Sequence, residues 1–166
     1  MITASVLAAA IALTPTVAVV PDAVPTITRK YGHASMHGFK PSEYRGKFFK
    51  VNPATAFRKC VMWRESRNTY GARNHPSVSS AAGAYQFLDI PWRQRSGSLP
   101  WMMHAENKRI YGVKTATRIR LTLTRTPIER WARHWQDQAF YTVLNWNGPW
   151  SGWHHWTGAS CNGLAR

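Results

Sequence analysis

The hydrophobic and polar positions after residue 50 follow a helical rather than an alternating pattern. Asn52 is a good N-cap and Pro53 fits the first helical position, so a helix with an apolar side is expected to begin there. Asp89 is expected to cap a second helix, and residues 101–111 predict a third that ends at Gly112. Because no stretch alternates for long, the pattern predicts a mainly helical domain.

The last helix and the connecting segments are marked by turn-forming residues. The Thr-Pro-Ile-Glu segment at residues 126–129 has the order of a capping box with proline at the first helical position. It predicts a helix that runs to about Leu144. Residues 70–82 are rich in Gly, Asn, Pro and Ser and predict a loop.

The chain divides into three segments of different composition. Residues 1–25 begin with an uncharged run rich in Ala, Val, Ile and Leu, which indicates a signal peptide or an N-terminal anchor. The run lacks the basic start of a signal peptide and contains Pro15, so a tail that docks on a partner or a virion is the alternative. Residues 26–51 mix Pro, Gly, His, Lys and Arg without periodicity and predict a basic linker. Residues 52–166 are the predicted folded domain.

The 166 residues include 22 basic and 7 acidic side chains, which give a formal net charge of +15. Such a surface predicts a polyanionic partner: nucleic acid, an anionic wall polymer or the headgroups of a membrane surface. The seven histidines show no ligand spacing, so no metal or cofactor is expected. The two cysteines, Cys60 and Cys161, indicate one disulfide in an exported protein, and two buried free thiols are the alternative.

Glu65 is the acidic residue best placed for chemistry, because it lies near the end of an aromatic-rich helical segment. Glycosidic cleavage needs a carboxyl group that is protonated near neutral pH. Contact with aromatic rings raises the pKa of a glutamate above its ordinary value of about 4.3. Trp63, Tyr70 and Tyr85 are near in sequence and are candidates for that contact, while the neighbouring arginines are expected on the outer face. A simple ion pair with an arginine is the alternative role.

One ordered set of motifs resembles a known family. Arg-Glu-Ser ends the helix at residues 64–66, a Ser/Ala/Gly loop follows, and Gly-Ala-Tyr-Gln-Phe occupies residues 83–87 ahead of Trp92. A Gln-Asp-Gln segment at residues 136–138 and a tryptophan-rich run to Cys161 complete the order. The set resembles the lysozyme-like lytic transglycosylases, and within them the resuscitation-promoting-factor type. The segment from Gln94 to Arg125 is longer than in the compact form of those domains and is strongly basic.

The resemblance implies a mainly α, lysozyme-like (soluble lytic transglycosylase-like) single domain with a groove for peptidoglycan glycan strands. Glu65 would protonate the oxygen of the β-1,4 bond between N-acetylmuramic acid and N-acetylglucosamine, and would then act as a base on the muramoyl C6 hydroxyl or on water. No strong second carboxylate is found, since Asp89 and Glu129 are assigned to helix starts, and this favours transglycosylation. Hydrolysis stays open because Glu106 and Asp137 have no assigned role.

The same resemblance implies a set of groove residues. The amide of Gln86 is expected to bond a sugar, or alternatively to hold the loop backbone. Tyr85 is expected to stack on a sugar ring, with Tyr70 as a second substrate-binding ring. Gln138 or Trp146 is expected on the opposite wall of the groove, or alternatively in the packing.

Two other functions compete with the enzyme. A nucleic-acid-binding module would account for the charge and for Arg118, Arg120 and Arg125, and it would bind with a steep salt dependence. A virion structural protein with an inactive lysozyme-like fold would account for the unusual N-terminus. The resemblance favours a secreted or cell-envelope-associated enzyme, virion-associated if a phage encodes it. Its expected partners are glycan strands and, through its basic face, anionic wall polymers or a membrane surface; nucleic acid is less favoured.

Overall fold

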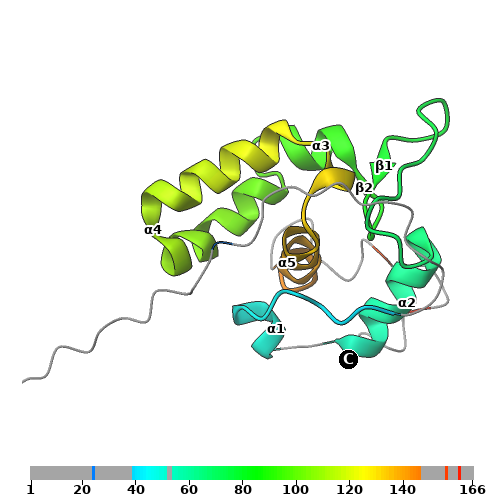
Figure 1. Ribbon diagram of the computed structural model, residues 1–166, viewed down its shortest axis with the longest axis horizontal. Coiled ribbons are helices and arrows are strands. Elements are labelled where there is room, and N and C mark those ends of the chain that lie inside the picture. Colours follow the sequence, from blue (N-terminus) through cyan, green and yellow to red (C-terminus); the bar gives the residue numbers. More distant parts are fainter. Residues whose placement is uncertain (1–23, 25–38, 52–53, 147–155, 157–160, 162–166) are drawn as a thin grey trace, which may run out of the picture.

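The computed structural model describes Val24, residues 39–51 and 54–146, Trp156 and Cys161 (Figure 1). These residues are mainly helical, as the hydrophobic pattern predicts. In chain order the elements are α1 (Lys47–Val51), α2 (Thr55–Ser66), β1 (Ala81–Ala82), β2 (Phe87–Leu88), α3 (Asp89–Gln94), α4 (Leu99–Arg125), the 3-10 helix η1 (Ile128–Arg130) and α5 (Arg133–Leu144).

Helix α5 lies in the middle of the described fold, with α1, α2 and α4 around it (Figure 1). Its apolar residues Trp135, Phe140 and Val143 are fully buried, and so are the three consecutive polar residues 136–138. Polar groups that leave water need hydrogen-bond partners inside the protein. The hydrogen-bond partners of these three residues come from distant parts of the chain and hold those parts against α5.

Helix α4 consists of two helical arms that meet at Gly112, where φ is 76° and ψ is 163°. The predicted helix end at Gly112 is therefore confirmed, because glycine adopts a positive φ without the clash of a Cβ. The second arm, residues 113–125, folds back beside the first (Figure 1). The sequence analysis predicted no secondary structure for residues 113–125. Ile119 and Leu123 are fully buried and pack the arm onto the core.

Strands β1 and β2 form a short antiparallel hairpin whose register pairs Ala82 with Phe87. The turn between them, residues 83–86, has positive φ at Gly83 (77°) and at Gln86 (51°). The sequence predicts no strand here, because two residues are too few to show an alternating pattern. The hairpin brings the Gly-Ala-Tyr-Gln-Phe segment next to the end of α2.

Residues 39–51 belong to the packed structure and not to the predicted linker. Tyr44 is 1% exposed, and Phe48 and Phe49 of α1 pack against the core. Four aromatic residues in a short basic segment are too few to show periodicity, so the sequence placed the start of the domain too late. Residues 1–23 and 25–38, with most of the predicted signal or anchor, lie outside the described residues. None of the described helices is long and apolar enough to cross a membrane.

The predicted cap at Asp89 is wrong. Asp89 is the first residue of α3, and the N-cap position belongs to Leu88. The buried Asp89 carboxylate instead accepts hydrogen bonds from Arg93 at 2.7 and 3.0 Å and from the backbone N–H of Ile128 at 3.2 Å. The Asp89 carboxylate, which the sequence predicted to cap the helix, therefore forms an i,i+4 ion pair with Arg93.

The predicted capping box at residues 126–129 is also wrong. Thr126 is the C-cap of α4, and the Glu129 carboxylate forms an ion pair with Arg73. The expected continuous helix is interrupted where the backbone of Trp131 and Ala132 is extended. There the fully buried Trp131 ring donates a hydrogen bond to the Thr126 carbonyl at 2.8 Å, so packing overrides the local helix signal. The predicted helix start at residues 52 and 53 lies outside the described residues.

Candidate functional site

Glu65 is the next-to-last residue of α2, on the same side of the helix as the buried Arg58 and Val61 and one position before the buried Ser66. Its side chain is 26% exposed. Both Nε and Nη2 of Arg64 donate to Glu65 Oε1, at 2.8 and 2.7 Å. The expectation that the neighbouring arginines face away is wrong for Arg64, because its long side chain bends back along the helix end. Arg67 does turn outward, with its guanidinium 5.0 Å from the ring centre of Trp63.

The Arg64 guanidinium connects Glu65 to the C-terminal part of the chain. Its Nη2 also donates to the carbonyl oxygen of Trp156 at 2.9 Å. The Trp156 ring is 2% exposed and donates through Nε1 to the carbonyl of Tyr85 at 3.2 Å. The end of α2, residue 156 and the turn of the β-hairpin therefore converge around Glu65.

The disulfide between Cys60 and Cys161 is present and holds the same two parts of the chain together. Its Cα atoms are 5.8 Å apart and the two residues are 101 positions apart in sequence. Cys60 precedes Glu65 by five residues on α2. The cross-link therefore fixes the glutamate helix to the segment that contributes Trp156.

The β-hairpin turn is attached both to α2 and to α5. Ser66 Oγ donates to the Ala84 carbonyl at 2.8 Å, and the Ala84 N–H donates to Gln136 Oε1 at 2.8 Å. The amide of Gln86 donates to the carbonyl of Gly83 at 3.0 Å, within its own turn. In this structure Gln86 thus holds the loop backbone, which is the alternative role that the sequence left open.

Replacing Gly83 by alanine is expected to lower the free energy of unfolding by more than the same change at Gly97. Both glycines have a φ near +76°, so each alanine adds about 1 kcal/mol of backbone strain. A Cβ at Gly83 would lie 2.6 Å from Gln136 Oε1, whereas a Cβ at Gly97 would meet nothing within 4 Å. The contact should add about 1–3 kcal/mol. Urea unfolding of both variants tests this, and equal losses would contradict it.

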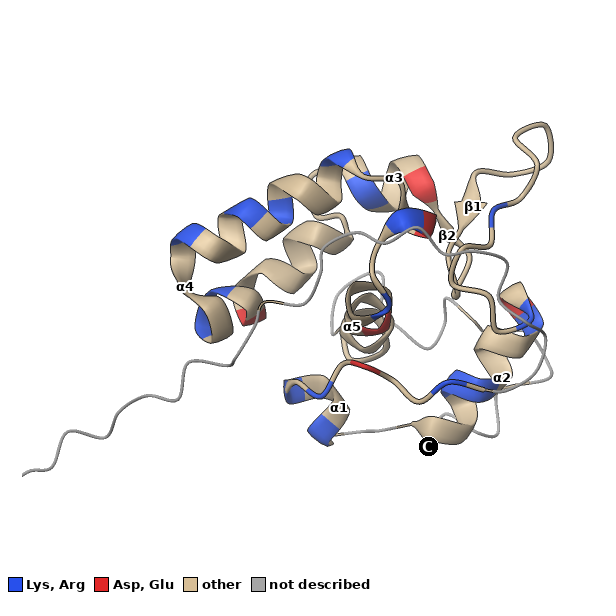
Figure 2. Cartoon of the chain, viewed as in Figure 1, with Lys and Arg blue, Asp and Glu red and all other residues tan. Residues whose placement is uncertain are grey.

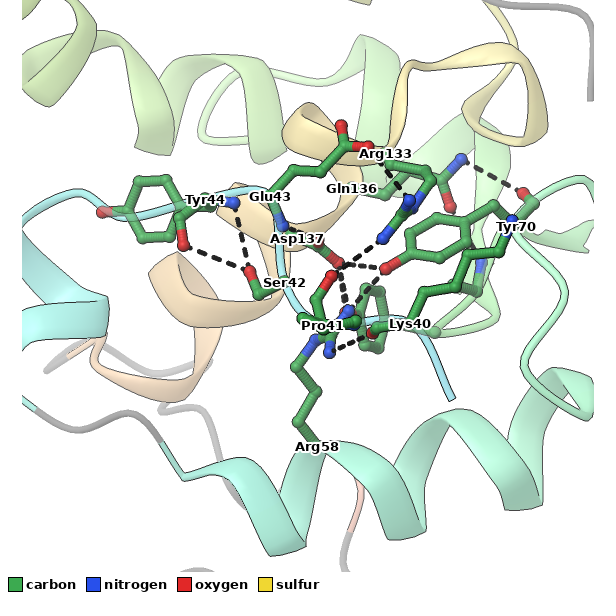
Figure 3. A network of polar contacts seen from close by, with 12 residues as sticks. Lys40, Pro41, Ser42, Glu43, Tyr44, Arg58, Tyr70, Arg133, Gln136 and Asp137 are labelled. Carbon is green, nitrogen blue, oxygen red and sulfur yellow. Dashed lines mark hydrogen bonds and ion pairs between the residues drawn. The ribbon is translucent and has the colours of Figure 1, made fainter. Parts of the chain in front are cut away.

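A buried polar network ties α2 to α5 two turns before Glu65 (Figure 3). Nη2 of Arg58, on α2, lies 2.8 Å from Oδ1 of Asp137, on α5, and both side chains are almost fully buried. The hydroxyls of Tyr70 and Tyr85 each donate to the same Oδ1 at 2.6 Å. The N–H of Glu43 donates to Oδ2 at 2.8 Å. The sequence analysis did not predict this network, although an aspartate in a helix that also carries Trp135, Phe140 and Val143 is a signal of a buried pair.

Alkaline pH is expected to destabilise the fold through Tyr70 and Tyr85. Burial, and then the charge of Asp137, raise the pKa of both phenols above the ordinary value of about 10. The unfolded chain therefore loses these protons first, so their contribution is complete below about pH 10 and falls as the pH rises further. Urea unfolding from pH 8 to pH 11 measures this loss. Tyr85→Phe should be less stable at pH 8 and show a weaker alkaline decline; an unchanged decline would contradict the assignment.

Three of the five predicted substrate-binding residues are buried: Tyr70, Tyr85 and Gln138. Tyr85 and Tyr70 are 1% and 3% exposed, so neither ring presents a face to a sugar. Gln138 is 1% exposed and donates to Asn107 Oδ1 at 2.9 Å. Gln86 bonds its own turn, and Trp146 is partly buried against the core. Side chains that look accessible in a loop or at a helix end are drawn inward here by Asp137 and by the aromatic core.

Each of the other described carboxylates has a partner of its own. The ion pairs and hydrogen bonds join Asp89 to Arg93, Asp137 to Arg58, Glu43 to Arg133, Glu129 to Arg73, and Glu106 to Tyr44 and Lys47. Asp89, Glu106 and Asp137 are buried. Glu65 and Glu43, with side chains 26% and 35% exposed, are the more accessible ones. Of these two, Glu65 is the one beside the hairpin turn and Trp156.

Two pockets of the described structure lie at other places. One, of about 270 Å³, is lined by Phe39, Pro41, Ser42, Arg45, Phe49, Thr55, Arg58, Lys59 and Tyr141. The other, of about 230 Å³, is lined by Leu88, Pro91, Trp92, Arg95, Ser96, Gly97 and Ser98. Glu65 lines neither of them. Within the described residues, no three His, Cys, Asp or Glu side chains are grouped so that they could hold a metal ion.

No family model, curated protein or solved structure matches this chain. The likeness to lytic transglycosylases therefore rests on the ordered residues of the sequence alone.

Proposed function

We propose that the protein cleaves the β-1,4 bond between N-acetylmuramic acid and N-acetylglucosamine in peptidoglycan, with Glu65 as the single catalytic carboxylate. The observation that supports this most is the position of Glu65. It is a partly exposed carboxylate at a helix end, where the Gly-Ala-Tyr-Gln-Phe turn and the disulfide-linked C-terminal segment meet. This is the set of segments in which the sequence resembles a lytic transglycosylase.

In the proposed reaction the carboxyl group of Glu65 donates its proton to the glycosidic oxygen, and the carbon–oxygen bond to the leaving sugar breaks. The carboxylate then removes a proton from the muramoyl C6 hydroxyl, which closes a 1,6-anhydro ring, or from water, which gives a reducing end. The Arg64 guanidinium has to leave Oε1 before that oxygen can carry the proton. Arg64 is also held by the Trp156 carbonyl, so it can stay in place at the site when the pair with Glu65 opens.

The surroundings of the other carboxylates support a mechanism with one acid. Asp89, Glu106 and Asp137 are buried and hydrogen-bonded, and a glycosidase with two carboxylates needs the second one at the open substrate face. The substrate's own N-acetyl group can assist bond breaking in its place. A lysozyme-like fold with a groove along Glu65 is part of this proposal, with Gln86 and Trp146 as candidate wall residues.

The proposed place of action is outside the cytoplasm, in the cell envelope or on a virion. A disulfide that joins residues far apart in sequence suits an oxidising compartment. Peptidoglycan is reached from that side, so the compartment and the proposed substrate agree.

The test is a digest of purified cell-wall sacculi with the full chain, followed by mass spectrometry of the released fragments. Anhydro-muropeptides would support transglycosylation. Fragments heavier by one water, with a reducing end, would support hydrolysis by the same glutamate. A folded, disulfide-bonded protein that releases neither product from sacculi of several wall types would contradict the proposal.

A further inference from the structure

The second arm of α4, residues 113–125, carries a row of cations on its outer face. Lys114, Arg118 and Arg125 are exposed, and together with the exposed Leu121 they follow each other at helical spacing. The row is opposite the buried side of the same arm. It extends over about 16 Å of helix at 1.5 Å per residue. Figure 2 shows the basic positions recurring along this arm.

The charges of this row are not balanced nearby. Residues 107–125 contain no aspartate or glutamate, and the buried Glu106 carboxylate accepts hydrogen bonds from the Tyr44 hydroxyl and the Lys47 backbone N–H. In the part of the chain that the structure describes, no ion pair joins a cation of this arm to an acidic side chain. Like charges at i and i+4, as at 114 and 118, destabilise an isolated helix. An exposed row of this kind therefore favours an external polyanion as its partner.

We propose that this row, which we call the α4 cation row (Lys114, Arg118 and Arg125), binds a linear phosphodiester polymer of the cell envelope, such as a poly(polyol phosphate). The row is one residue wide, which suits an extended chain that passes along the helix. This inference rests on the charge distribution of α4 and does not depend on the proposed function of Glu65. It would hold the protein on the wall whether or not Glu65 cleaves glycan strands.

Two other polyanionic partners, a membrane surface and a single-stranded nucleic acid, fit the row less well. A helix that lies in a membrane surface inserts a continuous apolar face between lipids. In this arm Ala116, Ile119 and Leu123 are buried in the core, and the exposed Val113 and Leu121 are separated by cations and threonines. Single-stranded nucleic acid is held by exposed aromatic rings, and the exposed Trp101 beside this arm has the Arg120 guanidinium 4.0 Å from its ring centre. The disulfide also indicates a compartment in which wall polymers are the common phosphodiesters.

The test measures binding of fluorescently labelled poly(glycerol phosphate) to the full chain by anisotropy, at salt concentrations from about 50 to 200 mM. The triple variant Lys114→Gln, Arg118→Gln, Arg125→Gln should bind at least tenfold more weakly than the wild type. The slope of log affinity against log salt should fall by about two to three, because about three phosphate contacts are lost. The control triple Lys40→Gln, Lys50→Gln, Arg95→Gln removes the same charge from exposed sites outside α4 and should change little.

Equal weakening in both triple variants would overturn the proposal, because net charge alone would then explain binding. Tighter binding of double-stranded DNA, or of vesicles that contain phosphatidylglycerol, than of the polymer at the same salt would also overturn it. Circular dichroism checks folding, and the single variant Arg118→Glu serves as a second test if the triple variant is unfolded. Glu65→Gln should bind the polymer like the wild type, so a failure of the proposed catalysis and a failure of this inference are distinguishable.

Discussion

Glu65→Gln is expected to reduce the release of muropeptides from sacculi by a factor of about 10²–10⁴. Glutamine keeps the size and polarity of the side chain but has no proton to donate to the glycosidic oxygen, and general acid–base catalysis contributes a factor of this size. The fold should be unaffected, because the side chain is 26% exposed and its partner Arg64 is also held by the Trp156 carbonyl. Release is measured by chromatography and mass spectrometry of the soluble fragments.

The matched control for this prediction is Glu43→Gln. Glu43 is the other accessible carboxylate, 35% exposed, and it pairs with Arg133 at 3.1 Å. It belongs to the segment before α1 and bonds α5 through its backbone, so losing its charge should leave fragment release unchanged. A Glu65→Gln protein that is as active as the wild type would remove Glu65 from the mechanism. A loss in the Glu43 variant alone would assign the acid to that residue.

Asp137→Asn is expected to lower the free energy of unfolding by about 3–5 kcal/mol, the usual cost of removing one partner of a buried ion pair. Arg58 is 1% exposed, so its charge would stay buried opposite a neutral amide. The hydroxyls of Tyr70 and Tyr85 would also lose their shared charged acceptor. Urea unfolding at neutral pH, followed by tryptophan fluorescence, measures the loss.

The control again is Glu43→Gln, which breaks a pair that is open to solvent and should cost less than about 1 kcal/mol. The double variant Arg58→Met, Asp137→Leu tests whether the pair itself is responsible. Removing both charges should cost less than the sum of the two single replacements, because no unpaired charge remains. Additive losses, or an Asp137→Asn protein as stable as the Glu43 variant, would contradict the role given to the pair.

Local signals in the sequence gave the helical class, the end of the first α4 arm at Gly112 and the position of Glu65 near a helix end. They failed where a carboxylate pairs with a guanidinium instead of capping a helix. Asp89 and Glu129 have the residue types and positions of helix starts, yet their carboxylates pair with Arg93 and Arg73. A cap contributes about 1 kcal/mol, and the Asp89 carboxylate gains more from the Arg93 guanidinium, because both side chains are buried.

Around the candidate site, the sequence predicted the disulfide between Cys60 and Cys161 but not the surroundings of Tyr70 and Tyr85. Tyr70 and Tyr85 look like groove residues because they follow Glu65 in loops rich in small residues. Their hydroxyls turn inward because Asp137, far along the chain, offers an acceptor in the core. The sequence analysis predicted no helix for the second α4 arm. Its many threonines and cations obscure the short apolar row of Ile119 and Leu123 that is buried.

What the sequence by itself determined was local: which stretches are helical, where glycine ends a helix, and that two cysteines have only each other as an internal partner. Tertiary structure alone decided what surrounds Glu65 and what holds α2 in place. The contacts concerned join residues 79 and 92 positions apart, Arg58 with Asp137 and Arg64 with the Trp156 carbonyl. A helical period tells which side of a helix is apolar, but the meeting of two long polar side chains depends on how whole helices pack.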